Sequence, residues 1–161
     1  MNLNICFNTR EKLPGYITID PFNDGTGNEG IVNADIYCFD KLCLDGEAQS
    51  IRAVGVLEYF QAAVADKIFG YWLKKLAYGG TITIGGVEPY LLSKRLVMRA
   101  ISIADYNEIM FGMQRHPWEY KKAVVDIVNT DRYLKGKGLQ VVSKEIYEDY
   151  KYIITAKKVL K

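Results

Sequence analysis

The feature that most constrains the fold is the order and spacing of short segments rich in Ile, Val and Leu. Four of them precede the first long helical segment, at residues 1–7, 16–20, 30–35 and 51–57. A fifth, at 81–84, follows that helical segment, and two more, at 139–143 and 150–156, are joined by a short charged turn. Parallel strands need crossover connections, whereas the last two strands can form a hairpin. We therefore expect an α/β fold with a mainly parallel sheet that contains one antiparallel strand.

The clearest helical pattern lies between the fourth and fifth strands. Apolar residues spaced four apart predict an amphipathic helix over residues 62–77, namely Val64, Ile68, Trp72 and Leu76. The run Tyr78-Gly79-Gly80 is expected to stop this helix, since glycine accepts the left-handed conformation that ends one. Further helices are expected at 89–101, 105–111 and 117–128, the last with Pro117 in its first turn.

The length and composition fit one globular domain. A chain of 161 residues that is 49% apolar and 25% charged can bury a substantial core, so we expect a single domain over 1–161. The net charge of +2 gives no reason to expect nucleic acid as a partner. We expect no membrane segment, because no apolar stretch reaches about 18 residues. With no basic leader before an apolar run, the expected location is cytoplasmic.

The cysteines do not predict a disulfide framework or a metal site. Cys6, Cys38 and Cys43 are odd in number and lack Cys-x-x-Cys spacing. A zinc site of the Cys/His type needs four ligands, and the chain holds one histidine, His116. We interpret the three cysteines as small apolar residues and expect no metal.

The strand pattern also locates a candidate site. In open α/β sheets, ligands bind beyond the carboxyl ends of the strands, where the strand order switches. Four segments follow strand ends here and are the candidates: Cys6 to Asn8, Asp20, Asp35, and Val56 to Tyr59.

Several motifs in this order resemble the small class I S-adenosylmethionine-dependent methyltransferases, of the type 11-like kind. They are Leu-Asn-Ile at 3–5, Leu-Pro-Gly-Tyr before the strand that ends at Asp20, Ala-Asp-Ile at 34–36, Val-Leu-Glu-Tyr-Phe at 56–60 and Gly-Gly-Thr at 79–81. Residues 106–117 also resemble a downstream segment of these proteins. Such small methyltransferases occur beside sugar-transferring enzymes or in viruses, and the short chain fits a viral source.

The resemblance implies a Rossmann-like, doubly wound, seven-stranded sheet that binds S-adenosylmethionine, here with a minimal helix layer. Asp20 would accept hydrogen bonds from the ribose hydroxyls, because a carboxylate only accepts and can take both. Asp35 and Ile36 would border the adenine. Val56, Leu57 and Glu58 would lie near the methionine end and the substrate mouth.

The chain departs from the family at the glycine-rich turn after the first strand. Cys6, Phe7 and Asn8 stand where the family has glycine-x-glycine, and they place side-chain atoms where the methionine portion would lie. Tyr59 replaces a histidine of the family and Tyr78 replaces a proline. These changes bear on cofactor binding more than on the fold.

Two of the candidates have alternative interpretations. His116 is the only histidine, the residue type whose ordinary pKa lies nearest neutral pH, and it is therefore a candidate general base. It also precedes an expected helix start, where it would serve equally as a capping or packing residue. Glu58 opens a helical segment, where the helix dipole favours an acid whatever its function.

Two functions of different classes follow. The first is S-adenosylmethionine-dependent methyl transfer to a small molecule or glycan, with Asp20 and Asp35 binding the nucleoside. The alternative is a catalytically inactive methyltransferase-like interaction or structural module, and a third option is another nucleoside-binding enzyme that shares Asp20. A chain this short is also a candidate homodimer, which would cover an exposed sheet face or edge.

Overall fold

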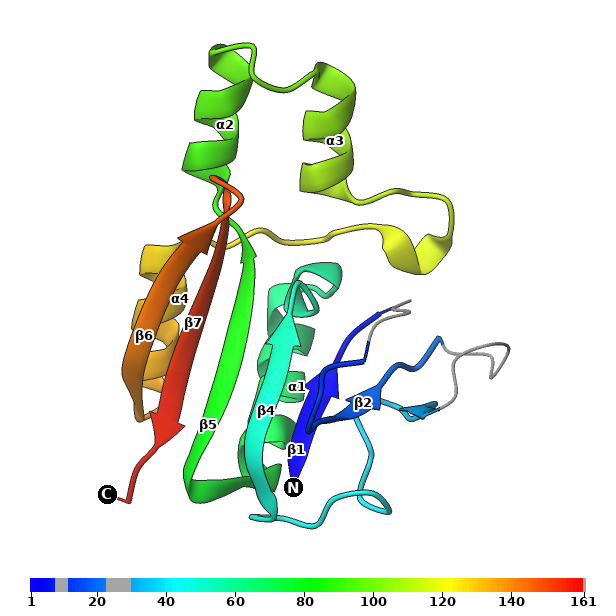
Figure 1. The fold of residues 1–161 in the computed structure, drawn as a ribbon, viewed down its shortest axis with the longest axis vertical. Helices are drawn as coiled ribbons and strands as arrows, with labels where there is room; N and C mark the ends of the chain where they lie inside the picture. The colour runs from blue at the N-terminus through cyan, green and yellow to red at the C-terminus, as the bar shows by residue number, and fades with distance from the viewer. Residues whose placement is uncertain (8–11, 23–29, 161) are drawn as a thin grey trace.

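A computed structural model describes residues 1–7, 12–22 and 30–160 (Figure 1). Within these residues one sheet has the strand order β3-β2-β1-β4-β5-β7-β6. Its strands are β1 (Asn2–Ile5), β2 (Ile17–Ile19), β3 (Ile31–Val32), β4 (Ala48–Val54), β5 (Leu76–Val87), β6 (Leu139–Tyr147) and β7 (Lys151–Lys158). Strand β7 runs antiparallel to both of its neighbours, and all other pairs are parallel. The predicted mainly parallel sheet with one antiparallel strand is confirmed.

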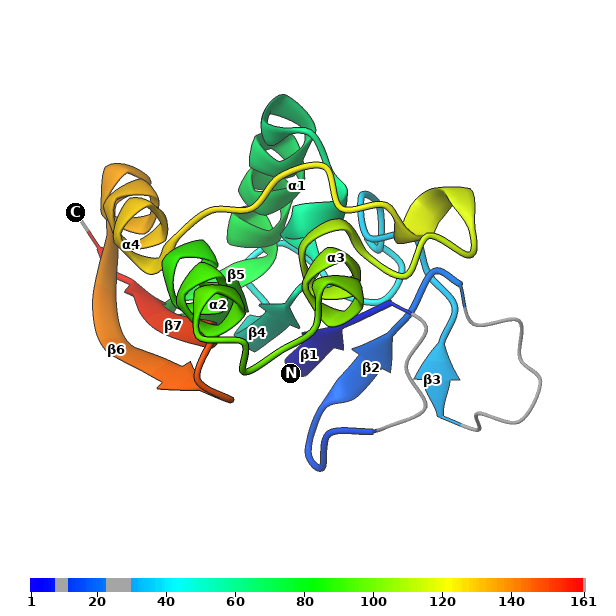
Figure 2. The same ribbon diagram turned by 90° about the horizontal axis from the view of Figure 1, so that it is seen from above.

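The helices of the described residues lie on one side of this sheet or beyond its end. They are α1 (Ala62–Lys75), α2 (Pro89–Val97), α3 (Ile103–Phe111) and α4 (Ile127–Gly136), with short 3-10 turns η1 (Leu57–Tyr59) and η2 (Pro117–Glu119). Figure 2 shows α1 and α4 above the same face of the sheet. Helices α2 and α3 form a pair that projects past the carboxyl end of β5 (Figure 1).

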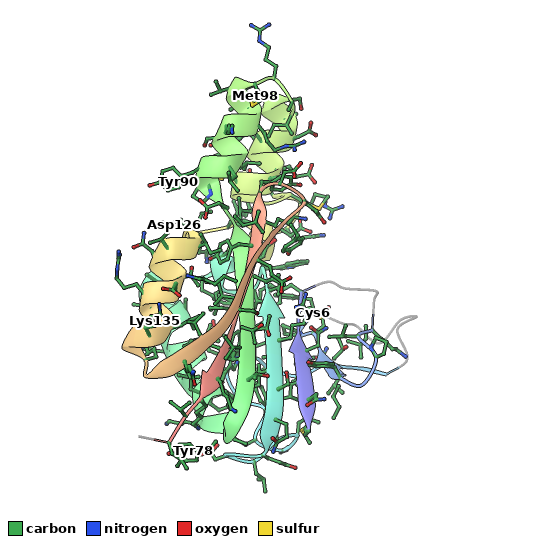
Figure 3. All side chains as sticks on the ribbon, turned by 60° about the vertical axis from the view of Figure 1, so that its left-hand side comes forward. Cys6, Tyr78, Tyr90, Met98, Asp126 and Lys135 are labelled. Atoms are coloured by element: carbon green, nitrogen blue, oxygen red, sulfur yellow. The ribbon has the colours of Figure 1, made fainter. Side chains whose placement is uncertain are left out.

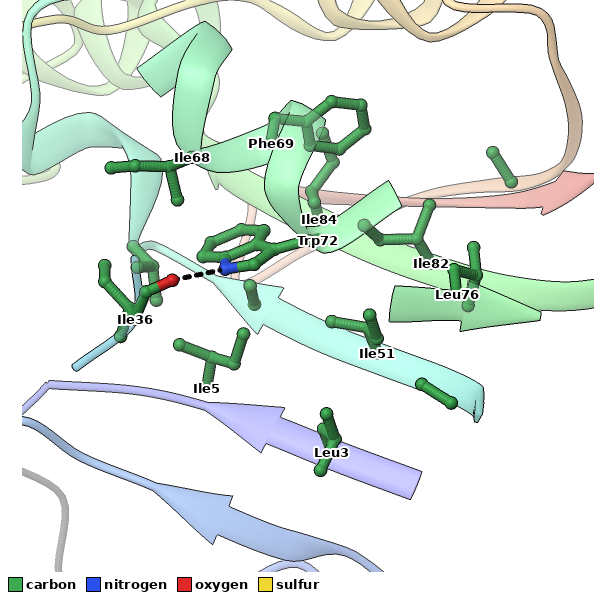
Figure 4. Packing of buried hydrophobic residues seen from close by; sticks show 14 of the residues in the cluster. Leu3, Ile5, Ile36, Ile51, Ile68, Phe69, Trp72, Leu76, Ile82 and Ile84 are labelled. Carbon is green, nitrogen blue, oxygen red and sulfur yellow. Dashed lines mark hydrogen bonds between the residues drawn. The ribbon is translucent and has the colours of Figure 1, made fainter. Parts of the chain in front are cut away.

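The core lies between α1 and the sheet. Ile68, Phe69 and Trp72 of α1 are buried against apolar strand residues such as Ile51 and Ile82 (Figure 4). The indole nitrogen of Trp72 donates a hydrogen bond of 3.0 Å to the carbonyl of Ile36, which anchors the segment after β3 to the helix. The four-residue spacing read from the sequence therefore marks the buried face of α1.

The opposite face of the sheet carries a row of polar side chains next to apolar ones such as Val54 and Ile153. Pairing places one row of polar side chains across six strands, in the order Thr18, Asn4, Arg52, Thr83, Thr155 and Ser143. The hydroxyls of Thr83 and Thr155 lie 2.9 Å apart. Strands that alternate apolar and polar residues suit a sheet with one face in water. Where the resemblance implies helices on both faces, the described helices cover one.

Two of the predicted helix boundaries are wrong. The helix α1 ends at Lys75 and β5 begins directly at Leu76, so Gly79-Gly80 lies within the strand and does not stop the helix. The helix expected at 117–128 is only the turn η2, followed by chain without regular secondary structure over 120–126 and then α4. The cause is Asp126, whose side chain accepts hydrogen bonds from the N–H groups of Val128 and Asn129 and so begins a helix there.

The remaining segments keep their predicted type with shifted ends. The fourth strand runs over Ala48–Val54 and the first helix after β5 ends at Val97. No helix among the described residues is long and apolar enough to cross a bilayer.

Candidate functional site

The carboxyl ends of β1, β2 and β3 meet at one edge of the sheet. The N–H of Cys6 donates to the carbonyl of Ile19, and the N–H of Asp20 donates to the carbonyl of Val32, each over 3.0 Å. These bonds continue the strand pairing past the strand ends. Cys6 and Asp20, two residues predicted for the site, therefore lie side by side (Cys6 is labelled in Figure 3).

Asp20 is a buried carboxylate at the end of β2. Its side chain is 1% exposed, and Oδ1 accepts a hydrogen bond of 2.9 Å from the N–H of Phe22. Burial, and then the charge of Asp20, raise the pKa of the Cys6 thiol to about 12. The raised pKa favours the neutral thiol of Cys6, which is a poor nucleophile.

Asp35 and Ile36 follow β3 but point into different surroundings. Asp35 is exposed, and its Oδ1 accepts a 2.8 Å hydrogen bond from the N–H of Tyr37. Ile36 is 1% exposed and belongs to the core beneath α1. The exposed ring beside Asp35 is that of Tyr37, which the sequence analysis did not identify.

An aromatic cluster, made of Phe7, Phe22, Tyr59 and Phe60, fills the edge next to Asp20. The ring of Phe7 lies 5.3 Å from Phe22, 5.5 Å from Tyr59 and 5.8 Å from Phe60, with edge-to-face geometry at each contact. Phe7 occupies the middle of the segment where the resembled family has its glycine-rich turn. Side-chain packing replaces bare backbone at this position.

His116 reaches the same edge through stacked rings. Its imidazole stacks on Trp118 at 5.3 Å, and Trp118 stacks on Phe22 at 4.2 Å. Phe22 follows Asp20 by two residues, so the chain of rings links His116 to the end of β2. Trp118 and Phe22 are further site residues that sequence reasoning missed, since no local spacing marks a contact between residues this far apart.

Glu58 holds two parts of the chain together. Its Oε1 accepts a 2.7 Å hydrogen bond from the N–H of Val87, and its Oε2 pairs with Lys121 at 2.8 Å. A Cβ at Gly86 would lie 2.4 Å from Oε1, so glycine is needed for this approach. Both carboxylate oxygens are engaged in linking the end of β5 to the segment 120–126.

Two further positions predicted for the site are Val56 and Asn8. Val56 is 1% exposed and packs in the core ahead of η1. Asn8 lies outside the described residues. No cluster of three His, Cys, Asp or Glu side chains that could hold a metal ion occurs in the part of the chain that the structure describes.

Several known structures have a similar fold. A SAM-dependent methyltransferase from Archaeoglobus fulgidus has a TM-score of 0.61 at 16% identity, over 98% of this chain and 86% of that one. The 1,6-didemethyltoxoflavin N1-methyltransferase of Burkholderia thailandensis, solved with 1,6-didemethyltoxoflavin and S-adenosylhomocysteine, also has a TM-score of 0.61, at 10% identity, over 99% of this chain and 72% of that one.

A third similar structure is longer. It is a possible exported protein from Bordetella parapertussis, with a TM-score of 0.59 at 14% identity. The match includes 99% of this chain but only 62% of that longer one. No family model matches the chain, and no curated protein matches its sequence. The chain therefore has the class I S-adenosylmethionine-dependent methyltransferase fold, although its sequence is only 10–16% identical to those of the similar structures described above.

Proposed function

We propose that this chain binds S-adenosylmethionine at the carboxyl ends of β1 and β2 and transfers its methyl group to a small molecule or glycan. The observation that carries the proposal is Asp20, a buried carboxylate at the end of β2 in a sheet with the class I methyltransferase strand order. An ionised carboxylate accepts hydrogen bonds and donates none, which suits the two hydroxyls of a ribose. The similar structures support the same cofactor.

The residues at this edge fit the nucleoside half of the cofactor. Asp20 would hold the ribose, and Asp35 with the exposed ring of Tyr37 would border the adenine. The methionine half would lie against Cys6 and Phe7, a neutral thiol and an apolar ring. When bound, the cofactor supplies an electrophilic methyl group on a sulfonium. The chain's own residues orient the reactants and exclude water, and we propose His116 as the group that takes a proton from the acceptor.

Calorimetric titration with S-adenosylmethionine and S-adenosylhomocysteine tests the cofactor site. We expect micromolar binding to the wild type and at least a tenfold weaker dissociation constant for Asp20→Asn, which keeps the size of the side chain but loses its charge. Asp149→Asn is the matched control, because Asp149 is an exposed carboxylate whose partner is Arg95 at the surface. At 100 times the dissociation constant, ligand should stabilise the wild type by about 2.7 kcal/mol.

The second candidate function is a catalytically inactive methyltransferase-like module that binds another protein or serves a structural role. The packing of Phe7 among three rings, where the family exposes backbone to the cofactor, favours it. A folded wild type that gives neither heat nor a thermal shift with either ligand would contradict methyl transfer and support this candidate.

A further inference from the structure

A cavity of about 200 Å³ lies on the helix-covered side of the sheet, away from Asp20. Its walls come from η1, α1, β5, α4, β7 and the segment 120–126, which crosses past α1 to reach α4 (Figure 2). The apolar part of the wall includes Leu57, Phe60, Ala65, Ile84 and Ala123. A space of this kind, bounded by side chains from six segments, is a formed pocket of the fold.

The polar side chains that line the cavity already have partners. The hydroxyl of Tyr152 lies 2.6 Å from that of Thr130 and donates to the carbonyl of Val125 over 2.8 Å. The hydroxyl of Tyr133 donates to Asp66, which also pairs with Lys137. Both oxygens of Glu58, as described above, are engaged. A charged ligand would therefore find no unneutralised partner in this wall, and its desolvation would be uncompensated.

We propose that this cavity binds a compact, uncharged molecule of one or two aromatic rings. The size fits, because an apolar cavity of about 150 Å³ is known to hold benzene. The wall fits as well, since three aromatic residues from different segments line it, Phe60, Tyr133 and Tyr152. A hydroxyl or ring N–H on the ligand would add one hydrogen bond to the tyrosine hydroxyls, which still have lone pairs to accept it.

This site is distinct from the proposed cofactor edge. Phe60 lines the cavity and also contacts the rings of Phe7 and Tyr37, at 5.8 Å each, so its ring forms the wall between the two places. Cys6, Asp20 and Asp35 do not line the cavity. Binding here needs no cofactor, and the inference stands whether or not the chain transfers methyl groups.

The test is a titration of the full chain with indole and with 2-naphthol, in the absence of cofactor, followed by two-dimensional amide NMR. We expect saturable binding with a dissociation constant below about 1 mM, and shifts at Ala65, Ala123 and Tyr152. Ala65→Leu fills the cavity and should weaken binding at least tenfold without lowering the melting temperature. Ala104→Leu, on the exposed surface of α3, is the matched control and should bind as the wild type does.

Ala123→Leu fills the cavity from the opposite wall and replaces Ala65→Leu as the test if that variant does not fold. The inference is overturned if neither probe binds the wild type, or if a folded cavity-filling variant binds as tightly as the control. It is also overturned if indole-3-acetate, which carries a charge, binds as well as indole.

Discussion

His116 illustrates how a single residue can carry two competing roles. Its ring stacks on Trp118 within a series of rings that ends at Phe22, two residues after Asp20, so the position serves packing, and we propose that it also serves catalysis. The two roles differ in what they require. Packing needs a flat ring, whereas a general base needs the imidazole nitrogen.

Two substitutions separate these roles. His116→Phe keeps a flat ring on Trp118 but cannot accept a proton. If His116 is the general base, kcat should fall by about 10²–10⁴-fold while the affinity for the cofactor stays unchanged. His116→Gln loses the ring and should give the same fall in kcat. Turnover of a methyl acceptor, with cofactor affinity by calorimetry, measures both. Full turnover by His116→Phe would show that the histidine serves packing alone.

The sequence predicts the polar residues at the carboxyl ends of the strands better than it predicts the aromatic residues packed beside them. Asp20 and Asp35 could be placed because each follows a short β-branched segment, and parallel strands bring such ends together. The rings of Phe22 and Trp118 stack although 96 positions of chain separate them, and no local period encodes that contact. The partners of Glu58, the N–H of Val87 and the ammonium of Lys121, are also remote from it in sequence.

At the scale of elements, α4 depends on the residue that precedes it, Asp126. Asp126 precedes Val128 and Asn129, and its carboxylate accepts hydrogen bonds of 2.9 Å from both N–H groups (Asp126 is labelled in Figure 3). The N–H of Asn129 is the main reason that the pKa of Asp126 lies below its usual value, against the opposing effect of burial. The ionised side chain is therefore the form that stabilises the helix.

Asp126→Ala should lower the free energy of unfolding by about 1 kcal/mol at pH 7. A carboxyl whose folded pKa is lowered contributes stability above its unfolded pKa of about 3.9, and that stability is lost as the pH falls through the folded value. The difference between wild type and variant should therefore shrink below about pH 4. Urea unfolding at pH 7 and pH 3.5 measures it. A difference that stays constant or grows in acid would contradict the capping role.

The predicted helix over residues 117–128 does not form, and the reason is a contact between elements. Pro117 and the following apolar residues favour a helix locally, and η2 is the one turn that forms. Beyond it, the carbonyl of Glu58 accepts hydrogen bonds from the N–H groups of Lys122 and Ala123, which keeps the chain from forming a helix there. A contact made from a distant segment thus overrides local propensity.

At the scale of the whole molecule, one face of the sheet is apolar and packs under α1, and the other carries a row of polar side chains. The row from Thr18 to Ser143 is polar in every strand it crosses; Thr18 is buried and the other five side chains are half-buried. The alternation of polar and apolar residues can be seen in the sequence, as in Thr81-Ile82-Thr83-Ile84 of β5. Homodimerisation through an exposed face or edge stays a prediction.

The face that the described helices leave uncovered also has a calorimetric consequence. Unfolding of a globular protein raises the heat capacity by about 12–15 cal/mol/K per residue, or about 1.9–2.4 kcal/mol/K for 161 residues, because buried apolar surface becomes hydrated. Since the described helices cover only one side of this sheet, we expect the other side to be partly hydrated in the native state. The heat-capacity change should then lie below that range, which gives a flatter dependence of stability on temperature. Scanning calorimetry at several pH values gives the slope of unfolding enthalpy against melting temperature. A value within or above the range would mean that in solution the polar face is covered.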